Sequence, residues 1–192
     1  MRKTAWLLAA LLGLALTAQA ATVQQLPFQA LIQQAERIVQ IKVTSLETEV
    51  IDGRAFTLAK CRILTTFKGK HESQISLRLP GGKVGAFTMI APGSPTLQLR
   101  ENEEMVAFLA KDENPQAKAV AWQPLGLGQG LFLRMQKGEK HYAIPRMENG
   151  PQHFADCDMP GDDCLRAGTV WGLEWNEFIA QIKAGVASLQ AQ

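Results

Sequence analysis

The chain has 192 residues, 46% of them hydrophobic, and its 20 lysines and arginines nearly balance 18 aspartates and glutamates. Nucleic-acid binding requires clustered basic side chains, so a sequence with no basic run argues against that function. The same lack of a basic run argues against polybasic attachment to a membrane surface. The length predicts one domain with a substantial core.

The first twenty residues predict a secretory signal peptide. Arg2 and Lys3 form a positive start, residues 6–17 form an apolar run, and an Ala-Gln-Ala tripeptide ends at Ala20. The apolar run is shorter than the roughly 20 residues that span a bilayer, so cleavage after Ala20 is favoured over an uncleaved anchor. We therefore expect a periplasmic or secreted mature chain, 21–192, without net charge or a stable membrane anchor.

Three cysteines remain after the signal peptide. Cys157 and Cys164 enclose a Pro-Gly pair that can reverse the chain, which predicts a disulfide contributing about 2–3 kcal/mol in the chain-entropy model. Cys61 lies in a strand-like run, where a small buried apolar role is favoured over an intermolecular bridge or a redox role.

The first half of the mature chain reads as a helix followed by strands. Proline and helical apolar spacing predict a short helix over 27–37, and β-branched residues predict a strand over 38–50. Asp52-Gly53 is typical of a tight hairpin turn, and alternation predicts the return strand over 55–67. A third strand is expected over 74–80.

The second half continues the pattern. An almost wholly apolar strand is expected over 103–110, one or two glycine-broken strands over 119–135, and a short strand over 141–146. Residues 146–168 are expected to be irregular and pinned by the disulfide. Helical spacing of Trp and aliphatic residues predicts an amphipathic terminal helix over 174–190.

Together these elements predict one α+β domain over 21–192, mainly antiparallel. We expect a small OB-like barrel or curled sheet with an N-terminal helix and a C-terminal amphipathic helix.

The glycine-rich stretch 79–95 invites comparison with a phosphate-binding loop. It lacks the Ser or Thr that should follow Gly82-Lys83, and Pro92 and Pro95 prevent a helix from following. A structured loop is therefore expected. The apolar residues of this loop are Phe87, Met89 and Ile90. They are expected either to pack on the core, which is favoured, or to be exposed as a partner-binding tip. A second glycine cluster, 126–130, predicts a bulged or closely packed strand.

Metal and catalytic signals are weak. Four aspartates around the disulfide could favour Ca²⁺, but an EF-hand register fails at Ala167, so a solvated acidic loop is favoured; they are Asp156, Asp158, Asp162 and Asp163. The three histidines, 71, 141 and 153, lack metal-binding spacing, and no serine, Ser94 included, lies in a nucleophile motif. No cofactor is expected. Core or rim roles are favoured over a sugar platform for Trp122, Trp171 and Trp175.

The order of several motifs resembles that of a broad set of uncharacterised bacterial exported proteins, over about residues 28–145. The matching residues are Phe67-Lys68-Gly69, Leu79-Pro80-Gly81-Gly82, Gly85, Gly93 with Pro95, and Glu103 through Phe108-Leu109. Asn102 stands where the pattern has glycine, and asparagine tolerates the same left-handed backbone.

The first half is also similar to the OB-like barrel of netrin-type and metalloproteinase-inhibitor domains. The mature chain lacks the inhibitors' N-terminal cysteine, which argues against that activity. These resemblances imply export and a small β-barrel, and they imply no activity.

The function that these observations favour is a non-catalytic binding or accessory module that docks a co-exported protein through the 79–95 loop. The alternatives are an envelope glycan-binding or structural protein, and an enzyme whose site only the fold assembles.

Overall fold

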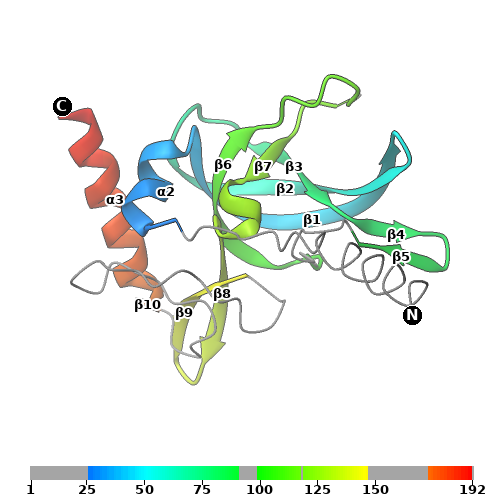
Figure 1. Ribbon diagram of the computed structural model, residues 1–192. Coiled ribbons are helices and arrows are strands. Elements are labelled where there is room, and N and C mark those ends of the chain that lie inside the picture. Colours follow the sequence, from blue (N-terminus) through cyan, green and yellow to red (C-terminus); the bar gives the residue numbers. More distant parts are fainter. Residues whose placement is uncertain (1–25, 91–98, 118, 147–172, 192) are drawn as a thin grey trace, which may run out of the picture.

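The structure is a computed structural model that describes residues 26–90, 99–117, 119–146 and 173–191. An eight-stranded sheet curls around a core, two helices pack at one end of it, and a separate two-stranded hairpin lies at the other end (Figure 1). All strand pairs are antiparallel except β3 with β7. The prediction of a mainly antiparallel α+β fold with a helix near each terminus is confirmed.

The elements in chain order are α2 (Phe28–Gln34), β1 (Arg37–Ile51), β2 (Arg54–Lys68), β3 (Gln74–Pro80), β4 (Gly82–Val84), β5 (Phe87–Met89), β6 (Glu104–Lys111), β7 (Trp122–Pro124), the 3-10 helix η2 (Leu125–Gly128), β8 (Leu131–Lys137), β9 (Lys140–Pro145), β10 (Leu173–Glu174) and α3 (Trp175–Gln190).

The longest feature is the β1–β2 hairpin, with strands of 15 residues each. Its turn is formed by Asp52 and Gly53 with φ angles of 49° and 72°, as the sequence predicted for a primed turn. Three register irregularities interrupt the pairing of β1 with β2. Because β-bulges bend and twist a strand, they account for the curl of the hairpin over the core.

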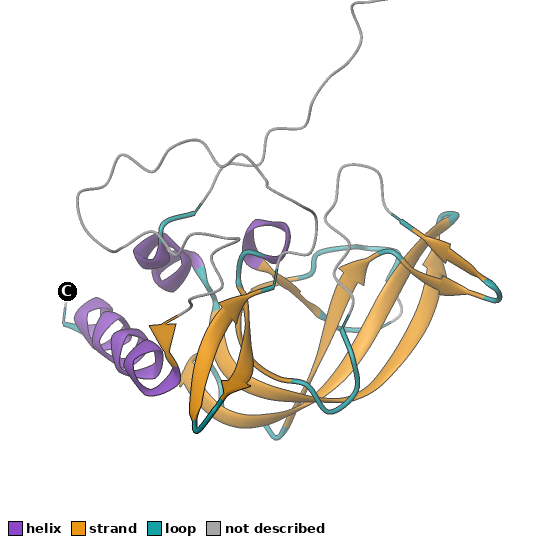
Figure 2. Ribbon diagram, turned by 90° about the horizontal axis from the view of Figure 1, so that it is seen from below, coloured by secondary structure: helices purple, strands orange, loops and turns teal. Residues whose placement is uncertain are grey.

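The sheet nearly closes on itself. One edge of β6 pairs with β1 over Arg37–Lys42, and β6 also pairs with β8 and β7. Strand β7 reaches β3 through a single pair, Leu77 with Trp122. The strands therefore curl into an incomplete ring, seen in Figure 2, and not into a regular barrel.

Strand β6 separates two hydrophobic cores. Met105, Ala107 and Leu109 face the core inside the curl, whereas Val106 and Phe108 face the core beneath the helices. All five side chains are fully buried, which explains the nearly continuous apolar sequence of this strand. Asn102, just before it, has a φ of 68° and takes the left-handed turn conformation that the sequence predicted.

The helix-side core is built around aromatic rings. Phe28 of α2 and Phe178 of α3 meet Phe108 and Phe132 of the sheet, with ring centroids 4.9–6.4 Å apart. The two helices also contact each other, since a Cβ on Gly185 would lie 2.6 Å from Ile32 Cδ1. Within the described part of the chain, no helix has the length and apolar character needed to cross a membrane.

The glycine cluster 126–130 differs in part from the expectation. Residues 125–128 form a 3-10 helix instead of a strand, with positive φ at Gly126, Leu127 and Gly128. The close packing is confirmed at Gly130, where a Cβ would lie 2.6 Å from the backbone oxygen of Phe108.

Candidate functional site

The 79–95 stretch contains a hairpin that the sequence did not predict. Strands β4 and β5 pair through Gly82 with Met89, Lys83 with Thr88 and Val84 with Phe87. Gly85 begins the two-residue turn with a φ of 61°, and glycine is the residue that type II′ turns require at this position. Residues 91–98 lie outside the described residues.

The prediction that the apolar residues of this stretch pack on the core is wrong for the described part. Phe87 is 77% exposed and Ile90 is 62% exposed, while Met89 and Val84 are 39% and 36% exposed. We call these four side chains the hairpin surface. Their exposure follows from the position of the hairpin, which extends away from both cores at the end opposite the helices (Figure 1).

The base of the hairpin is fixed on the β1–β2 ribbon. The Gly81 N–H donates to Ala55 O at 2.8 Å, and Thr57 Oγ1 donates to Gly81 O at 3.0 Å. A Cβ on Gly82 would meet the side chains of Thr48 and Thr57 at 2.9–3.2 Å, so any larger residue would force these side chains to move. By strand alternation, Val84, Phe87 and Met89 share the face of the hairpin that Gly82 presents to the ribbon.

Apolar exposure continues on the ribbon. Val50 lies two residues beyond Thr48, on the same face of β1, and is 56% exposed. The hairpin surface and Val50 therefore both lie at the end of the curled sheet that is opposite the helices, which we call the open end (Figure 1). Exposed apolar side chains that gather in this way are typical of a protein-binding surface.

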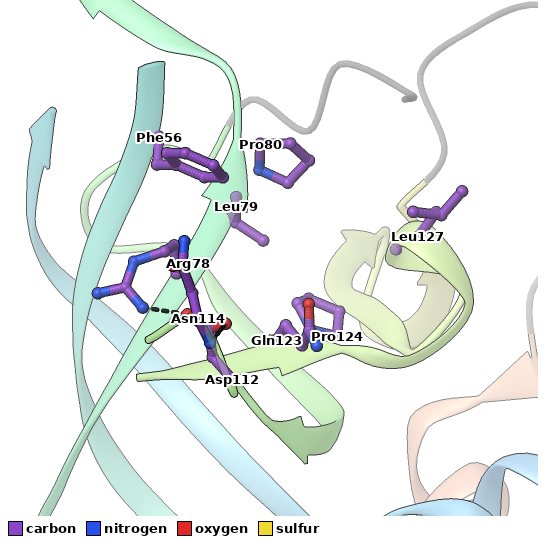
Figure 3. A pocket seen from close by; sticks show the side chains of 10 residues that line it. Phe56, Arg78, Leu79, Pro80, Asp112, Asn114, Gln123, Pro124 and Leu127 are labelled. Atoms are coloured by element: carbon purple, nitrogen blue, oxygen red, sulfur yellow. Dashed lines mark hydrogen bonds and ion pairs between the residues drawn. The ribbon is translucent and has the colours of Figure 1, made fainter. Parts of the chain in front are cut away.

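A pocket of about 220 Å³ lies beside the base of the hairpin, where the ring of strands is incomplete (Figure 3). Beyond the single Leu77–Trp122 pair, β7 ends at Pro124 and the chain turns into η2. The apolar lining consists of Phe56, Leu79, Pro80, Pro124 and Leu127, and the polar lining includes Arg78, Asp112, Asn114 and Gln123.

Arg78 forms one wall of the pocket and is buried. Its guanidinium pairs with the carboxylates of Glu49 and Asp112, and Nη2 donates to Ala119 O at 3.0 Å. Burial disfavours the charged form of Arg78 while the two carboxylates favour it, and the balance raises its pKa. The network joins β1, β3 and the segment after β6, so it stiffens the pocket.

The described titratable groups form no catalytic or metal constellation. No group of three potential metal ligands occurs among the described residues. Cys61 is buried as predicted, and burial raises the pKa of its thiol to about 12, so the thiol is unreactive near neutrality. His71 lies between β2 and β3, and His141 lies in β9.

Several predictions lie outside the described residues. These are the signal peptide, the Cys157–Cys164 disulfide, Ser94, His153, Trp171 and the Ca²⁺ candidates Asp156, Asp158, Asp162 and Asp163. Trp175 is buried under the sheet, and Arg37 lies over the ring of partly buried Trp122 at 5.1 Å, so these two tryptophans have core and rim positions as expected.

Sequence reasoning missed the pocket entirely. Its walls come from four separate parts of the chain, and a single residue pair brings β3 and β7 together. One local signal existed, because Pro124 followed by Leu-Gly-Leu-Gly shows that a strand ends at this point.

Comparisons of the chain with protein-family models, with curated proteins and with solved structures find no match. The resemblances to exported bacterial proteins and to netrin-type barrels therefore stay predictions.

Proposed function

We propose that this chain is an exported, non-catalytic binding module that docks a co-exported protein through the hairpin surface. The observation that carries the proposal is the exposure of Phe87, Met89 and Ile90 on a short hairpin whose base is rigidly held. Aromatic and methionine side chains are enriched at the centres of protein interfaces. A fixed base supports binding, because little conformational entropy is lost when a preorganised surface docks.

The alternatives receive less support from the described residues. A glycan platform needs several exposed aromatic rings, and Phe87 is the only exposed aromatic in the described part of the chain. Covalent catalysis needs a nucleophile near a base, and the described thiol, Cys61, is buried in the core inside the curl.

The test is affinity purification of the tagged protein from its own envelope fraction, followed by mass spectrometry. We expect a stoichiometric protein partner with the wild type and its loss with the double variant Phe87→Ser/Ile90→Ser. Truncating a central interface anchor typically costs at least about 2 kcal/mol, roughly a thirtyfold loss of affinity.

A matched control is available outside the hairpin, which forms a sheet of its own. Met135 of β8 is 47% exposed and Val120, before β7, is 78% exposed, and neither belongs to the hairpin surface. The variant Met135→Ser/Val120→Ser removes comparable exposed apolar area and should retain the partner. Recovery of the same partner by the hairpin variant, or of no stoichiometric protein by the wild type, would contradict the proposal.

A further inference from the structure

The pocket at the gap between β3 and β7 is a second candidate site, separate from the hairpin surface. Its volume of about 220 Å³ is below the roughly 300–1,000 Å³ of sites for drug-sized ligands and cofactors. A space of this size suits one peptide side chain with its adjoining backbone.

The charges of the pocket argue against an ionic ligand. Arg78 is paired with both Glu49 and Asp112, and Asp112 Oδ1 also accepts the backbone N–H of Asn114 at 3.1 Å. A charged ligand would therefore meet no unpaired charge of opposite sign in this lining. The uncharged polar groups of the lining are the side-chain amides of Gln123 and Asn114. The Gln123 amide has no hydrogen-bond partner among the described residues. The Asn114 amide uses only its Oδ1, which accepts from the backbone N–H of Gln116 at 3.1 Å.

The backbone of β3 also presents hydrogen-bonding groups to the gap. Ser73 O accepts from Ile63 N and Gly81 N donates to Ala55 O, so the odd-numbered residues of this segment face β2. Backbone groups alternate along a strand, and the register of β3 with β2 runs without a shift from Gln74 to Leu79. The carbonyls of Arg78 and Pro80 therefore face the opposite side, where β7 has already turned away at Pro124.

Leu127 adds an independent observation. It is 45% exposed, lines the pocket opposite Phe56 and Pro80 (Figure 3), and has a φ of 56°, which is unfavourable for any residue with a Cβ. The loop holds it there through Gly130 N donating to Leu125 O at 3.0 Å and Leu26 N donating to Gln129 Oε1 at 2.7 Å. Strained exposed residues held by their surroundings gather at binding sites.

We propose that this pocket binds an uncharged, extended peptide segment of a partner protein, with one aliphatic side chain inserted between Leu79, Pro124 and Leu127. The peptide N–H groups donate to the carbonyls of Arg78 and Pro80, and its carbonyl accepts from the Gln123 amide. The segment thus extends the β-ladder that β3 and β7 share through one pair.

The test uses N-acetyl-leucine methylamide as the probe and amide NMR of the purified exported protein as the readout. We expect saturable shifts at Gln123, Leu127 and Gly128, with the aspartate and lysine methylamides causing at least about tenfold weaker effects. In the variant Leu127→Gly the affinity for the leucine probe should fall about tenfold, as when one aliphatic contact is removed from a pocket. Its folding should be retained, because glycine relieves the positive φ.

Two further proteins keep the test decisive. Gln123→Ala should also weaken the binding of the leucine probe, although it leaves the apolar walls of the pocket unchanged. Phe87→Ser should bind the leucine probe like the wild type. The experiment therefore distinguishes a failure of hairpin docking from a failure of the pocket. The proposal is overturned if the leucine probe causes no shifts at the pocket. Equal binding of the aspartate probe, or unchanged leucine binding in both pocket variants, overturns it as well.

Discussion

The two ends of the molecule use the same kinds of side chain in opposite ways. At the helix end, Phe28, Phe108, Phe132 and Phe178 are buried against one another under α2 and α3. At the other end, the hairpin surface lies in solvent on a base fixed by the hydrogen bonds of Gly81 with Ala55 and Thr57. Apolar residues at the first end stabilise the fold, and those at the second are available to a partner.

This comparison predicts its largest effect at the centre of the aromatic cluster. Phe132 is 2% exposed, and its ring contacts Phe28, Phe108 and Phe178. Phe132→Ala should lower the free energy of unfolding by about 3–5 kcal/mol, because it removes transfer energy and leaves a cavity. Urea denaturation followed by tryptophan fluorescence measures the loss, and a loss below about 1 kcal/mol would show that this end is loosely packed.

A smaller loss is expected where a glycine meets the backbone. Gly130→Ala places a Cβ 2.6 Å from Phe108 O, which cannot move without disturbing β6, so a cost of about 1–3 kcal/mol is expected. Gly185→Ala is the matched control. Its Cβ would meet side-chain atoms and no backbone atom, namely Ile32 Cδ1 at 2.6 Å, Ile32 Cγ2 at 3.4 Å and Gln29 Oε1 at 3.6 Å. Alanine also gains about 1 kcal/mol of helix propensity, so the net change in stability by the same assay should be near zero. Equal losses in the two variants would contradict the distinction.

The buried thiol in the other core gives a prediction in alkaline solution. Burial raises the pKa of Cys61 from an ordinary value near 9 to about 12, so the folded chain keeps a proton that the unfolded chain releases. The stability that Cys61 contributes is therefore fully present below pH 9 and declines as the pH rises toward 12.

Urea denaturation of the wild type and Cys61→Ala at about pH 8 and about pH 10 measures this decline. The stability difference between the two proteins should become smaller at the higher pH. A difference that stays constant would mean that the Cys61 thiol is accessible to solvent.

The smallest effect on stability is expected at the hairpin surface. Phe87→Ser/Ile90→Ser removes exposed side chains, so the free energy of unfolding should change by no more than about 0.5 kcal/mol. The control Met135→Ser/Val120→Ser should behave alike in the same urea assay. A loss of about 2 kcal/mol or more in the hairpin variant alone would show that these residues belong to a core, and the docking proposal would fail.

The sequence predicted the parts of the fold that local chemistry determines. Asp52-Gly53 identified the long hairpin, and Trp175, Phe178 and Ile182 identified the buried face of α3. Spacing alone does not tell whether an apolar residue reaches a core. The sequence therefore could not show that Phe87 and Ile90 are exposed. The pocket depends on β3 and β7 meeting from distant parts of the chain, and no local pattern reports such a contact.

The claim that the open end binds a partner is tested most directly by photo-crosslinking in the cells that export the protein. Phe87→p-benzoylphenylalanine keeps an aromatic ring at the exposed hairpin position, and Met135→p-benzoylphenylalanine places the same group on β8 as a control. We predict one discrete crosslinked protein from position 87 and none from position 135. No crosslink at position 87, or the same products from both positions, would contradict the account.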